Sequence, residues 1–308
     1  MTPDGGGVMA RIGIVLGAGL GKGAYQIGVL RAVEERFSQK DIVSVSCSSI
    51  GVLNGVGYRC GRLDELEQAW LEMAGGSFRG FIGSVLRSER FSRLLDDFAA
   101  YSGSLSGELL ITLTDLTDMS ADYCLFNDIP EKKRADYLRA SVSIPGLTRC
   151  LSLGGKRCVD GGWIDGIPVW PLIGKELDYI ICVYFDRSRY IFEDKSIDSK
   201  VLSVTFPDDT IFTNAVFLRE ESVRHMKKVG YDVACEIFDD VFSRGADDAE
   251  YVSGRINEIN SRAGKRSLRL TTDVVITNVN RLAKHLTVRR ILDDGRAVGE
   301  RKRENDAK

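Results

Sequence analysis

A turn around Ser49 has the residue types of a nucleophilic catalyst. The letters C-S-S-I-G at residues 47–51 follow a predicted strand and precede an apolar helix that begins at about residue 50. A sharp strand-to-helix turn with the pattern G-x-S-x-G exposes its serine, and the dipole of the helix favours negative charge there. Cys47 replaces the first glycine, and Gly51 supplies the second. Ser49 is therefore the candidate nucleophile. Ser48 is the competing serine, and an ordinary turn is the alternative interpretation.

A second turn, G-A-G-L-G-K-G at residues 17–23, follows an apolar stretch and opens a helix. A Walker phosphate loop fails here, because Leu16 and Gly23 occupy positions that require glycine and a hydroxyl residue. A dinucleotide fingerprint also fails, because Lys22 stands at its third glycine. Backbone N–H groups at a helix N-terminus can instead form an oxyanion hole for a tetrahedral intermediate. The N–H groups of this turn are then the candidate donors. A tight packing turn is the alternative.

Asp160 lies in a third turn, V-D-G-G at residues 159–162, after a predicted strand. A serine nucleophile needs a base, and the two histidines, His225 and His285, both lie in a late helical region. Asp160 could act as the base directly, although the unperturbed pKa of a carboxyl, about 4, is low for this task. Seclusion from water would raise that pKa. Asp-Gly-Gly is a common turn in itself, so its meaning depends on the other two turns.

The three turns need strands and helices to hold them. Short apolar stretches predict strands at residues 11–16, 41–47, 109–116, 179–185 and 202–206. Helical spacing of apolar residues predicts helices at about residues 24–37, 63–74, 77–101 and 135–143, besides the helix that begins at residue 50. Strands that alternate with helices predict an α/β fold with a mainly parallel central sheet covered on both faces.

The region 207–308 has a different pattern and is predicted to be mostly helical. Helices are expected at about residues 213–241 and 248–263, and we expect this region to pack on the preceding domain at least to about residue 242. Residues 1–10 are predicted to be a flexible N-terminus, and the basic stretch 281–308 a helical or frayed end. The catalytic domain is therefore expected to span residues 11–206.

The composition excludes several classes of protein. The net charge of −2 over 308 residues is too balanced for a nucleic-acid-binding protein. Seven cysteines, an odd number without a C-x-x-C pair, predict reduced thiols in place of a disulfide framework or zinc site. Residues 1–10 lack an apolar h-region, so we do not expect them to be a secretory signal, and no apolar run approaches the roughly 20 residues of a membrane span. We therefore expect a cytoplasmic protein whose membrane contact is transient and peripheral.

Together and in this order, the three turns resemble the patatin-like phospholipase family. The similar segments are IVLGAGLGKGAYQIGVL at 14–30, SCSSIGVLNGVGYRCG at 46–61 and ASVSIPGLTRCLSLGGKRCVDGGWIDGIPVWPL at 140–172. The resemblance implies a three-layer α/β fold and a Ser–Asp dyad with Ser49 as nucleophile and Asp160 as base. It also implies an oxyanion loop at residues 19–23 and no metal or cofactor. Asp165 is not expected to be the dyad partner. The glycines expected to support the elbow and the aspartate turn are Gly51, Gly161 and Gly162.

The function expected from this resemblance is hydrolysis of acyl esters in phospholipids or other lipids, of the phospholipase A or lysophospholipase type. The family pattern G-G-G-x-[KR]-G falls on residues 18–23, where Ala18 and Leu20 replace two glycines. If Leu20 supplies an oxyanion N–H, its side chain must turn away from the substrate. This loop motivates a second hypothesis, a lipid-binding or regulatory protein with weak catalysis. A Ser-His-Asp esterase or thioesterase that uses His225 or His285 is the third. The sequence does not identify protein partners.

Overall fold

The computed structural model describes residues 10–74, 82–186, 189–206, 218–262 and 266–269. Its centre is an eight-stranded sheet in the order β5-β6-β3-β2-β1-β7-β9, with β4 paired to β3. The strands are β1 (Ile12–Leu16), β2 (Ile42–Ser48), β3 (Glu108–Asp115), β4 (Ser120–Leu125), β5 (Leu151–Leu153), β6 (Lys156–Asp160), β7 (Tyr179–Tyr184) and β9 (Val201–Thr205). The pairs β1–β2, β1–β7, β2–β3 and β7–β9 are parallel, which confirms the predicted α/β class with a mainly parallel sheet.

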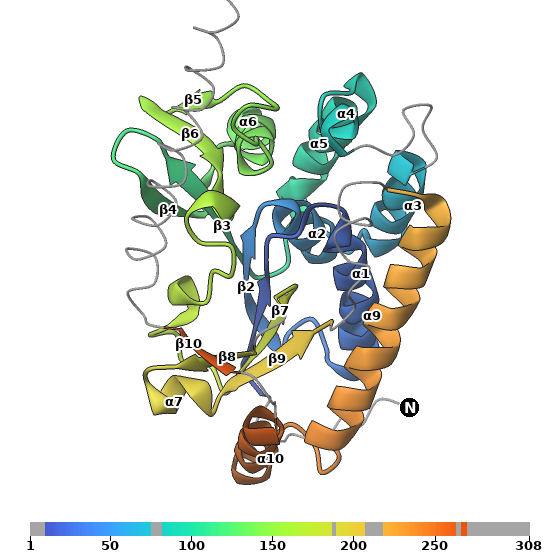
Figure 1. Ribbon diagram of the computed structural model, residues 1–308, viewed down its shortest axis with the longest axis vertical. Helices are drawn as coiled ribbons and strands as arrows, with labels where there is room; N and C mark the ends of the chain where they lie inside the picture. The colour runs from blue at the N-terminus through green and yellow to red at the C-terminus, as the bar shows by residue number, and fades with distance from the viewer. Residues whose placement is uncertain (1–9, 75–81, 187–188, 207–217, 263–265, 270–308) are drawn as a thin grey trace, which may run out of the picture.

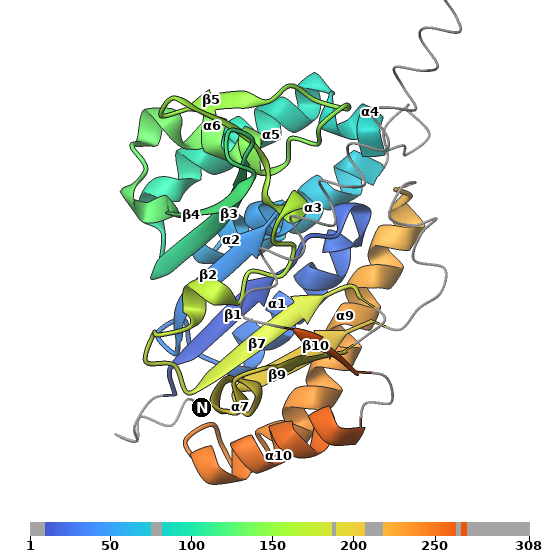
Figure 2. The same ribbon diagram turned by 60° about the vertical axis from the view of Figure 1, so that its left-hand side comes forward.

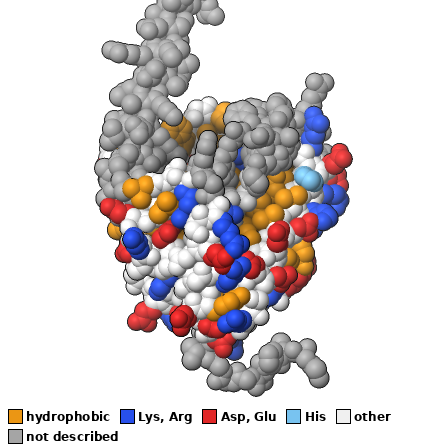
Figure 3. All heavy atoms as spheres, turned by 60° about the horizontal axis from the view of Figure 1, so that its bottom comes forward, with side chains coloured by type: hydrophobic (Ala, Val, Ile, Leu, Met, Phe, Trp, Pro, Cys, Tyr) orange, Lys and Arg blue, Asp and Glu red, His pale blue; other side chains and the backbone are white. Residues whose placement is uncertain are grey.

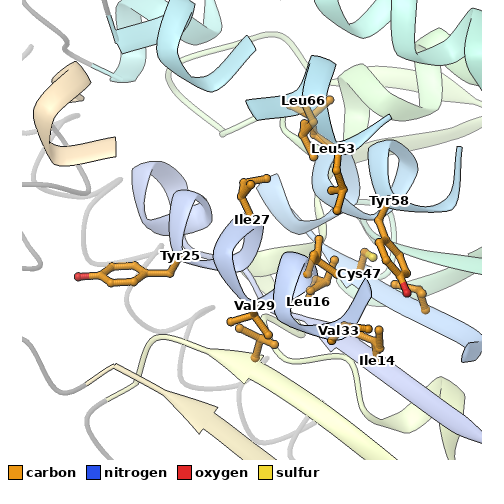
Figure 4. Packing of buried hydrophobic residues seen from close by; sticks show 14 of the residues in the cluster. Ile14, Leu16, Tyr25, Ile27, Val29, Val33, Cys47, Leu53, Tyr58 and Leu66 are labelled. Carbon is orange, nitrogen blue, oxygen red and sulfur yellow. The ribbon is translucent and has the colours of Figure 1, made fainter. Parts of the chain in front are cut away.

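Long helices cover one face of the sheet (Figures 1 and 2). They are α1 (Gly23–Arg36), α2 (Ile50–Arg59), α3 (Leu63–Ala74), α5 (Glu89–Tyr101), α6 (Glu131–Ser141) and α9 (Glu220–Val241). Figure 4 shows the centre of this core, where Leu16 and Cys47 of the strands meet Leu53 and Tyr58 of α2. The predicted bounds of α3 agree with the structure at both ends.

Helix α9 lies against α1, and two glycines allow the close approach. A Cβ built on Gly28 would lie 2.0 Å from the Lys227 carbonyl oxygen, and one on Gly230 would lie 2.1 Å from the Tyr25 carbonyl oxygen. Backbone therefore touches backbone at this crossing. The helix predicted for residues 213–241 is described from Glu220, and residues 213–217 lie outside the described part of the chain.

The opposite face of the sheet is covered by shorter elements. They are η4 (Gly161–Trp163), η5 (Trp170–Leu172), β8 (Arg189–Phe192), α7 (Lys195–Asp198) and β10 (Arg266–Arg269), which pairs in parallel with β8. A second buried cluster joins Val15 and Cys182 of the sheet to Val169, Leu172 and Phe192 of this layer. Helix α10 (Ala249–Arg262), close to the predicted helix at 248–263, packs against α9 and β9.

The region 77–101, predicted to be helical, consists of two helices in the part that the structure describes. Two helices, α4 (Ile82–Leu86) and α5, are separated at Ser88, whose side chain accepts a hydrogen bond from the Phe91 N–H at 3.1 Å. A serine that caps a helix in this way has extended backbone geometry, which ends the preceding helix. Residues 77–81 lie outside the described residues. Strand β4 was not predicted at all, because S-A-D-Y-C-L shows little apolar alternation.

All seven cysteines are free, as the spacing predicts. On the face drawn in Figure 3, acidic and basic side chains are interspersed between apolar ones. Within the described ranges, no helix has the length and apolarity that crossing a membrane requires. The predicted terminal segments, residues 1–9 and 281–308, lie outside these ranges.

Candidate active site

Ser49 occupies a sharp turn between β2 and α2. Its backbone has φ 57° and ψ −132°, a region that non-glycine residues rarely populate and that is found at functional sites. Helix α2 begins at the next residue, Ile50, so the helix N-terminus lies directly behind the serine. A Cβ built on Gly51 would lie 2.3 Å from the Leu16 carbonyl oxygen, so the elbow fits against β1 only with glycine here.

The register of β3 explains why Ser49 and Asp160 meet. Strands β4 and β6 both pair with residues 113–115 of β3, so they occupy opposite edges of that strand. Strands β2 and β4 both pair with residues 110–112 of β3, so they too lie on opposite edges of that strand. Strand β2 therefore lies on the same edge of β3 as β6. Ser48 ends β2 opposite Thr112, and Asp160 ends β6 opposite Leu113. The two strands thus approach each other end to end along one edge.

A short hydrogen bond joins the two candidate residues. The Ser49 hydroxyl donates to Asp160 Oδ2 at 2.6 Å, and both residues are only 4% exposed. The other carboxylate oxygen, Oδ1, accepts the Gly162 N–H at 2.7 Å. One oxygen of Asp160 is therefore held by the backbone while the other faces the serine, an arrangement suited to removal of the hydroxyl proton.

The backbone around Asp160 is anchored at three further points. Its N–H donates to the Ser143 carbonyl at 3.0 Å, and its carbonyl accepts from the Thr114 hydroxyl at 2.9 Å. A Cβ built on Gly161 would lie 2.2 Å from the Thr112 carbonyl oxygen. Ser143 and Thr114 could not be identified from the sequence, because these contacts arise from the pairing of distant strands and no local motif marks them.

The glycine turn converges on the same place. A Cβ built on Gly162 would lie 2.9 Å from Ala18 Cβ and 3.7 Å from Ser49 Cβ. Residues Leu20–Lys22 form the short 3₁₀ helix η1, which continues into α1 at Gly23. The three turns that the sequence singled out therefore surround one site at the carboxyl ends of the central strands.

The backbone of the turn separates the five candidate donors into two groups. The Lys22 N–H donates to the Gly19 carbonyl at 3.0 Å, and the Gly23 N–H donates to the carbonyls of Leu20 and Gly21. The first N–H groups of a helix have no carbonyl partner within it, and here these belong to Gly19, Leu20 and Gly21. Leu20 has a φ of 50°, and its side chain packs against the main core.

Two residues at the elbow have environments that differ from that of Ser49. Cys47 is fully buried beside Gly55 of α2, where a built Cβ would come within 2.4 Å of its sulfur. Burial raises the pKa of the Cys47 thiol, which makes it an inert packing group. Ser48 is also fully buried, and its hydroxyl has no hydrogen-bond partner among the described residues.

Asp165 lies in the same turn as Asp160 but has different partners. Its carboxylate accepts from the Tyr123 hydroxyl at 2.9 Å, from the Ile167 N–H at 3.2 Å and from the Arg269 guanidinium at 2.5 Å. Burial, and then the Asp165 charge, raise the pKa of the Tyr123 hydroxyl, which stays protonated as the donor. His225 is exposed on α9, and His285 lies outside the described residues.

Comparison with known proteins identifies the family. The model of patatin-like phospholipases matches residues 14–173, more than half of the 308 residues, so the chain belongs to the patatin-like phospholipase family. An NTE family protein of Mycobacterium tuberculosis is 30% identical over 189 residues, which cover 58% of this chain and 50% of the relative. Lysophospholipase NTE1 of Cryptococcus neoformans is 30% identical over 188 residues, which cover 56% of this chain and 11% of the relative. The chain thus matches half or less of the length of these relatives.

Solved structures show similarity at low sequence identity. VipD from Legionella pneumophila aligns with a TM-score of 0.46 and 13% identity, covering 94% of this chain and 78% of VipD. The type III effector protein ExoU aligns with a TM-score of 0.37 and 16% identity, covering 80% of this chain and 54% of ExoU.

In the described part of the chain, no cluster of three or more His, Cys, Asp or Glu side chains could hold a metal ion.

Proposed function

We propose that this protein is a serine acyl hydrolase that cleaves lipid esters with a Ser–Asp dyad. The observation that carries the proposal is the 2.6 Å hydrogen bond from Ser49 to Asp160, at a buried strand-to-helix turn. Membership of the patatin-like phospholipase family supports a lipid substrate. The name of the fungal relative, a lysophospholipase, supports phospholipase A or lysophospholipase chemistry. Contact with the lipid would be transient and peripheral.

The mechanism follows from the positions of the groups. Asp160 Oδ2 takes the proton of Ser49 as Oγ attacks the ester carbonyl, and returns it to the departing alcohol. Water, deprotonated by the same carboxylate, then attacks the acyl-enzyme, and Asp160 passes that proton to Ser49 Oγ as the acyl–oxygen bond breaks. The N–H groups of Gly19, Leu20 and Gly21, for which no hydrogen-bond partner is found among the described residues, stabilise the oxyanion, each contributing on the order of 3 kcal/mol. The proposed oxyanion hole is thus narrower than the predicted range 19–23, because the N–H groups of Lys22 and Gly23 are used within the turn.

The remaining predicted residues act as supports in this proposal. Gly51 and Gly161 let the elbow and the aspartate turn touch neighbouring backbone, and Gly162 donates to Asp160. We also propose residues 11–206 as the catalytic domain, with the region 207–308 packed on it at least to about residue 242. The close backbone contact between α1 and α9 supports this division.

The two alternative functions make different demands on the structure. A lipid-binding protein with weak catalysis is motivated by Leu20, but that side chain packs against the core, as an oxyanion role of its N–H requires. A Ser-His-Asp enzyme needs a histidine between serine and aspartate, whereas the Ser49 hydroxyl donates directly to Asp160. Both observations favour the dyad over the alternatives.

The test compares the buried Ser–Asp pair with an exposed one. Ser49→Ala and Asp160→Asn are assayed on a short-chain p-nitrophenyl ester and on lysophosphatidylcholine and phosphatidylcholine vesicles. The matched controls are Ser196→Ala and Asp194→Asn, since the Ser196 hydroxyl donates to Asp194 at 2.6 Å on the surface. We expect kcat to fall at least about 1,000-fold in the first pair and to stay unchanged in the controls.

Reaction with a fluorophosphonate probe separates the hypotheses. Labelling of the wild type that is lost in Ser49→Ala supports the nucleophile. A wild type that neither reacts with the probe nor cleaves any of the esters would instead favour a lipid-binding protein. Turnover retained in both Ser49→Ala and Asp160→Asn would refute the dyad, and loss of turnover on replacing both histidines with alanine would favour the Ser-His-Asp alternative.

A further inference from the structure

A chain of buried hydrogen bonds lies beneath the glycine turn. The Trp70 indole N–H donates to Asn54 Oδ1 at 3.0 Å, and Asn54 Nδ2 donates to Gln26 Oε1 at 2.7 Å and to the Gly23 carbonyl at 3.0 Å. Gln26 Nε2 then donates to the Gly17 carbonyl at 2.7 Å. The three side chains come from α3, α2 and α1, and together they reach both ends of the turn at residues 17–23.

The donor and acceptor groups allow only one direction of donation along this chain of hydrogen bonds. An indole N–H only donates, so the atom of Asn54 that faces Trp70 must be its oxygen. The nitrogen of Asn54 then faces Gln26, which fixes the orientation of the second amide in turn. All three side chains are at most 1% exposed, so water cannot replace a lost partner. A buried amide left without a partner is costly, which makes the arrangement all-or-none.

The carbonyls of Gly17 and Gly23, where the hydrogen-bond chain ends, matter because each belongs to a rigid peptide plane. The plane that contains the Gly17 carbonyl also carries the Ala18 N–H, which donates to the Gly166 carbonyl at 2.7 Å. The Gly23 carbonyl fixes the other end of the turn, after the candidate oxyanion donors of residues 19–21. With both ends held, the donors between them have little freedom to reorient.

The network also connects the turn to the nucleophile. Asn54 lies in the first turns of α2, the helix that starts directly after Ser49. The same rigid helix therefore sets the position of the serine and, through Asn54, the position of the glycine turn. A misplacement of about 1 Å between a nucleophile and its oxyanion donors can cost about 100-fold in rate.

We propose that Asn54, Gln26 and Trp70 form a positioning unit that holds the oxyanion donors in register with Ser49. This inference depends on the proposed function for its kinetic part. The network reaches the turn through the Gly17 and Gly23 carbonyls, so the three side chains act through the backbone of the turn.

The variants remove single parts of the network; Asn54→Leu and Gln26→Met keep nearly the same shape, whereas Trp70→Phe also loses ring volume. Trp70→Phe removes the indole N–H, Asn54→Leu removes the central amide, and Gln26→Met removes the contact with Gly17. The matched control is Asn260→Leu, because Asn260 is 3% exposed and donates to the Val201 carbonyl at 3.1 Å, in α10. We expect kcat on the p-nitrophenyl ester to fall about 10- to 100-fold in the network variants, with KM within about twofold. The control should lose stability but keep kcat.

A transition-state mimic distinguishes positioning from general loosening. The Ser49 hydroxyl adds to the carbonyl of an alkyl trifluoromethyl ketone and forms a hemiketal oxyanion. The matching ether lipid has no carbonyl and forms no oxyanion. In the network variants, affinity for the ketone should fall in parallel with kcat, and affinity for the ether should not change. Unchanged ketone affinity in folded Trp70→Phe and Gln26→Met would overturn the inference. An equal loss of kcat in Asn260→Leu would do so as well.

A measurement without turnover keeps the inference separate from the proposed function. In ¹⁵N-labelled protein, Trp70→Phe should shift the amide resonances of residues 17–21, and not only those next to Asn54 and to the Trp70 ring, which lies against Gly23. Absence of any shift in the turn would overturn the positioning role even if the wild type is active. If the wild type cleaves no ester and does not react with fluorophosphonate, the proposed function fails alone, and the resonance shifts still decide whether the network holds the turn.

Discussion

The pair formed by Asp165 and Arg269 gives the sharpest prediction about stability. The Asp165 side chain is 1% exposed and that of Arg269 is 13% exposed, and their closest atoms are 2.5 Å apart. Replacing Arg269 with methionine keeps much of the packing volume but leaves the buried carboxylate without its counter-charge. The residual partners are the Tyr123 hydroxyl and the Ile167 N–H.

The expected magnitude follows from this burial. Removing one member of a buried ion pair costs about 3–5 kcal/mol, and the two remaining donors place Arg269→Met near the lower value. Asp165→Asn should cost less, about 1–2 kcal/mol, because the guanidinium keeps its position 5.7 Å from the Tyr190 ring centre and reaches solvent more easily. The double variant should be more stable than the sum of the single losses predicts, with a coupling of about 1–3 kcal/mol.

Urea unfolding of the four proteins measures this cycle. Arg262→Met is the control, since Arg262 pairs with Glu258 on the surface with 66% and 40% of the side chains exposed. The control should change the free energy of unfolding by less than about 1 kcal/mol. The reasoning is refuted if Arg269→Met costs no more than Arg262→Met, or if the losses in the double variant are additive. Because Asp165 shares its turn with Gly162, which donates to Asp160, kcat should also fall in Arg269→Met.

Three further predictions concern the helix crossing, the strained leucine and the thiols. Gly230→Ala places a Cβ 2.1 Å from a backbone oxygen and should lower the free energy of unfolding by about 3 kcal/mol. Gly254→Ala lies on α10 with open space around it and should raise the free energy of unfolding by up to about 1 kcal/mol. The urea midpoints of the two variants check both values. Leu20→Gly relieves a φ of 50° at the expense of packing, so its stability should stay within about 1 kcal/mol and its kcat should be retained; a tenfold loss of kcat would show that the side chain itself is needed. With a disulfide reagent at pH 8, exposed Cys150 should react first. Burial raises the pKa of the Cys47 thiol, so this thiol should react only on unfolding. Mass spectrometry of the labelled peptides checks the order of reaction.

The local elements were predictable because their signals are local. Helix α3 has acidic residues in its first turn and apolar residues at helical spacing, and its bounds follow from these features. The parallel strands β1, β2 and β7 are continuous apolar or small stretches buried on both faces, which gives them a strong signal. The break at Ser88 was missed because a serine in a mixed-charge stretch is compatible with both a helix interior and a cap.

The geometry of the site could be predicted only in part. The types of residue in the three turns indicated which side chains could react, and the resemblance to a family connected Ser49 with Asp160. Their 2.6 Å contact, however, depends on two strands that share one edge of β3, and one of the strands that define this register, β4, has no clear pattern in the sequence. Pairing register is a long-range property, so no window of sequence around either residue contains it.

The rigidity of the site depends on residues beyond the segment that the family model matches. The Gly17 N–H donates to the Val183 carbonyl of β7, and Asp165 is paired with Arg269 of β10, although the match ends at residue 173. A fragment that ends at residue 173 would thus contain Ser49, Asp160 and the glycine turn, yet lack both anchors. Because a catalytic site needs its groups held to within a fraction of an ångström, the Val183 carbonyl of β7 and Arg269 of β10 belong to the proposed site as much as the three turns do.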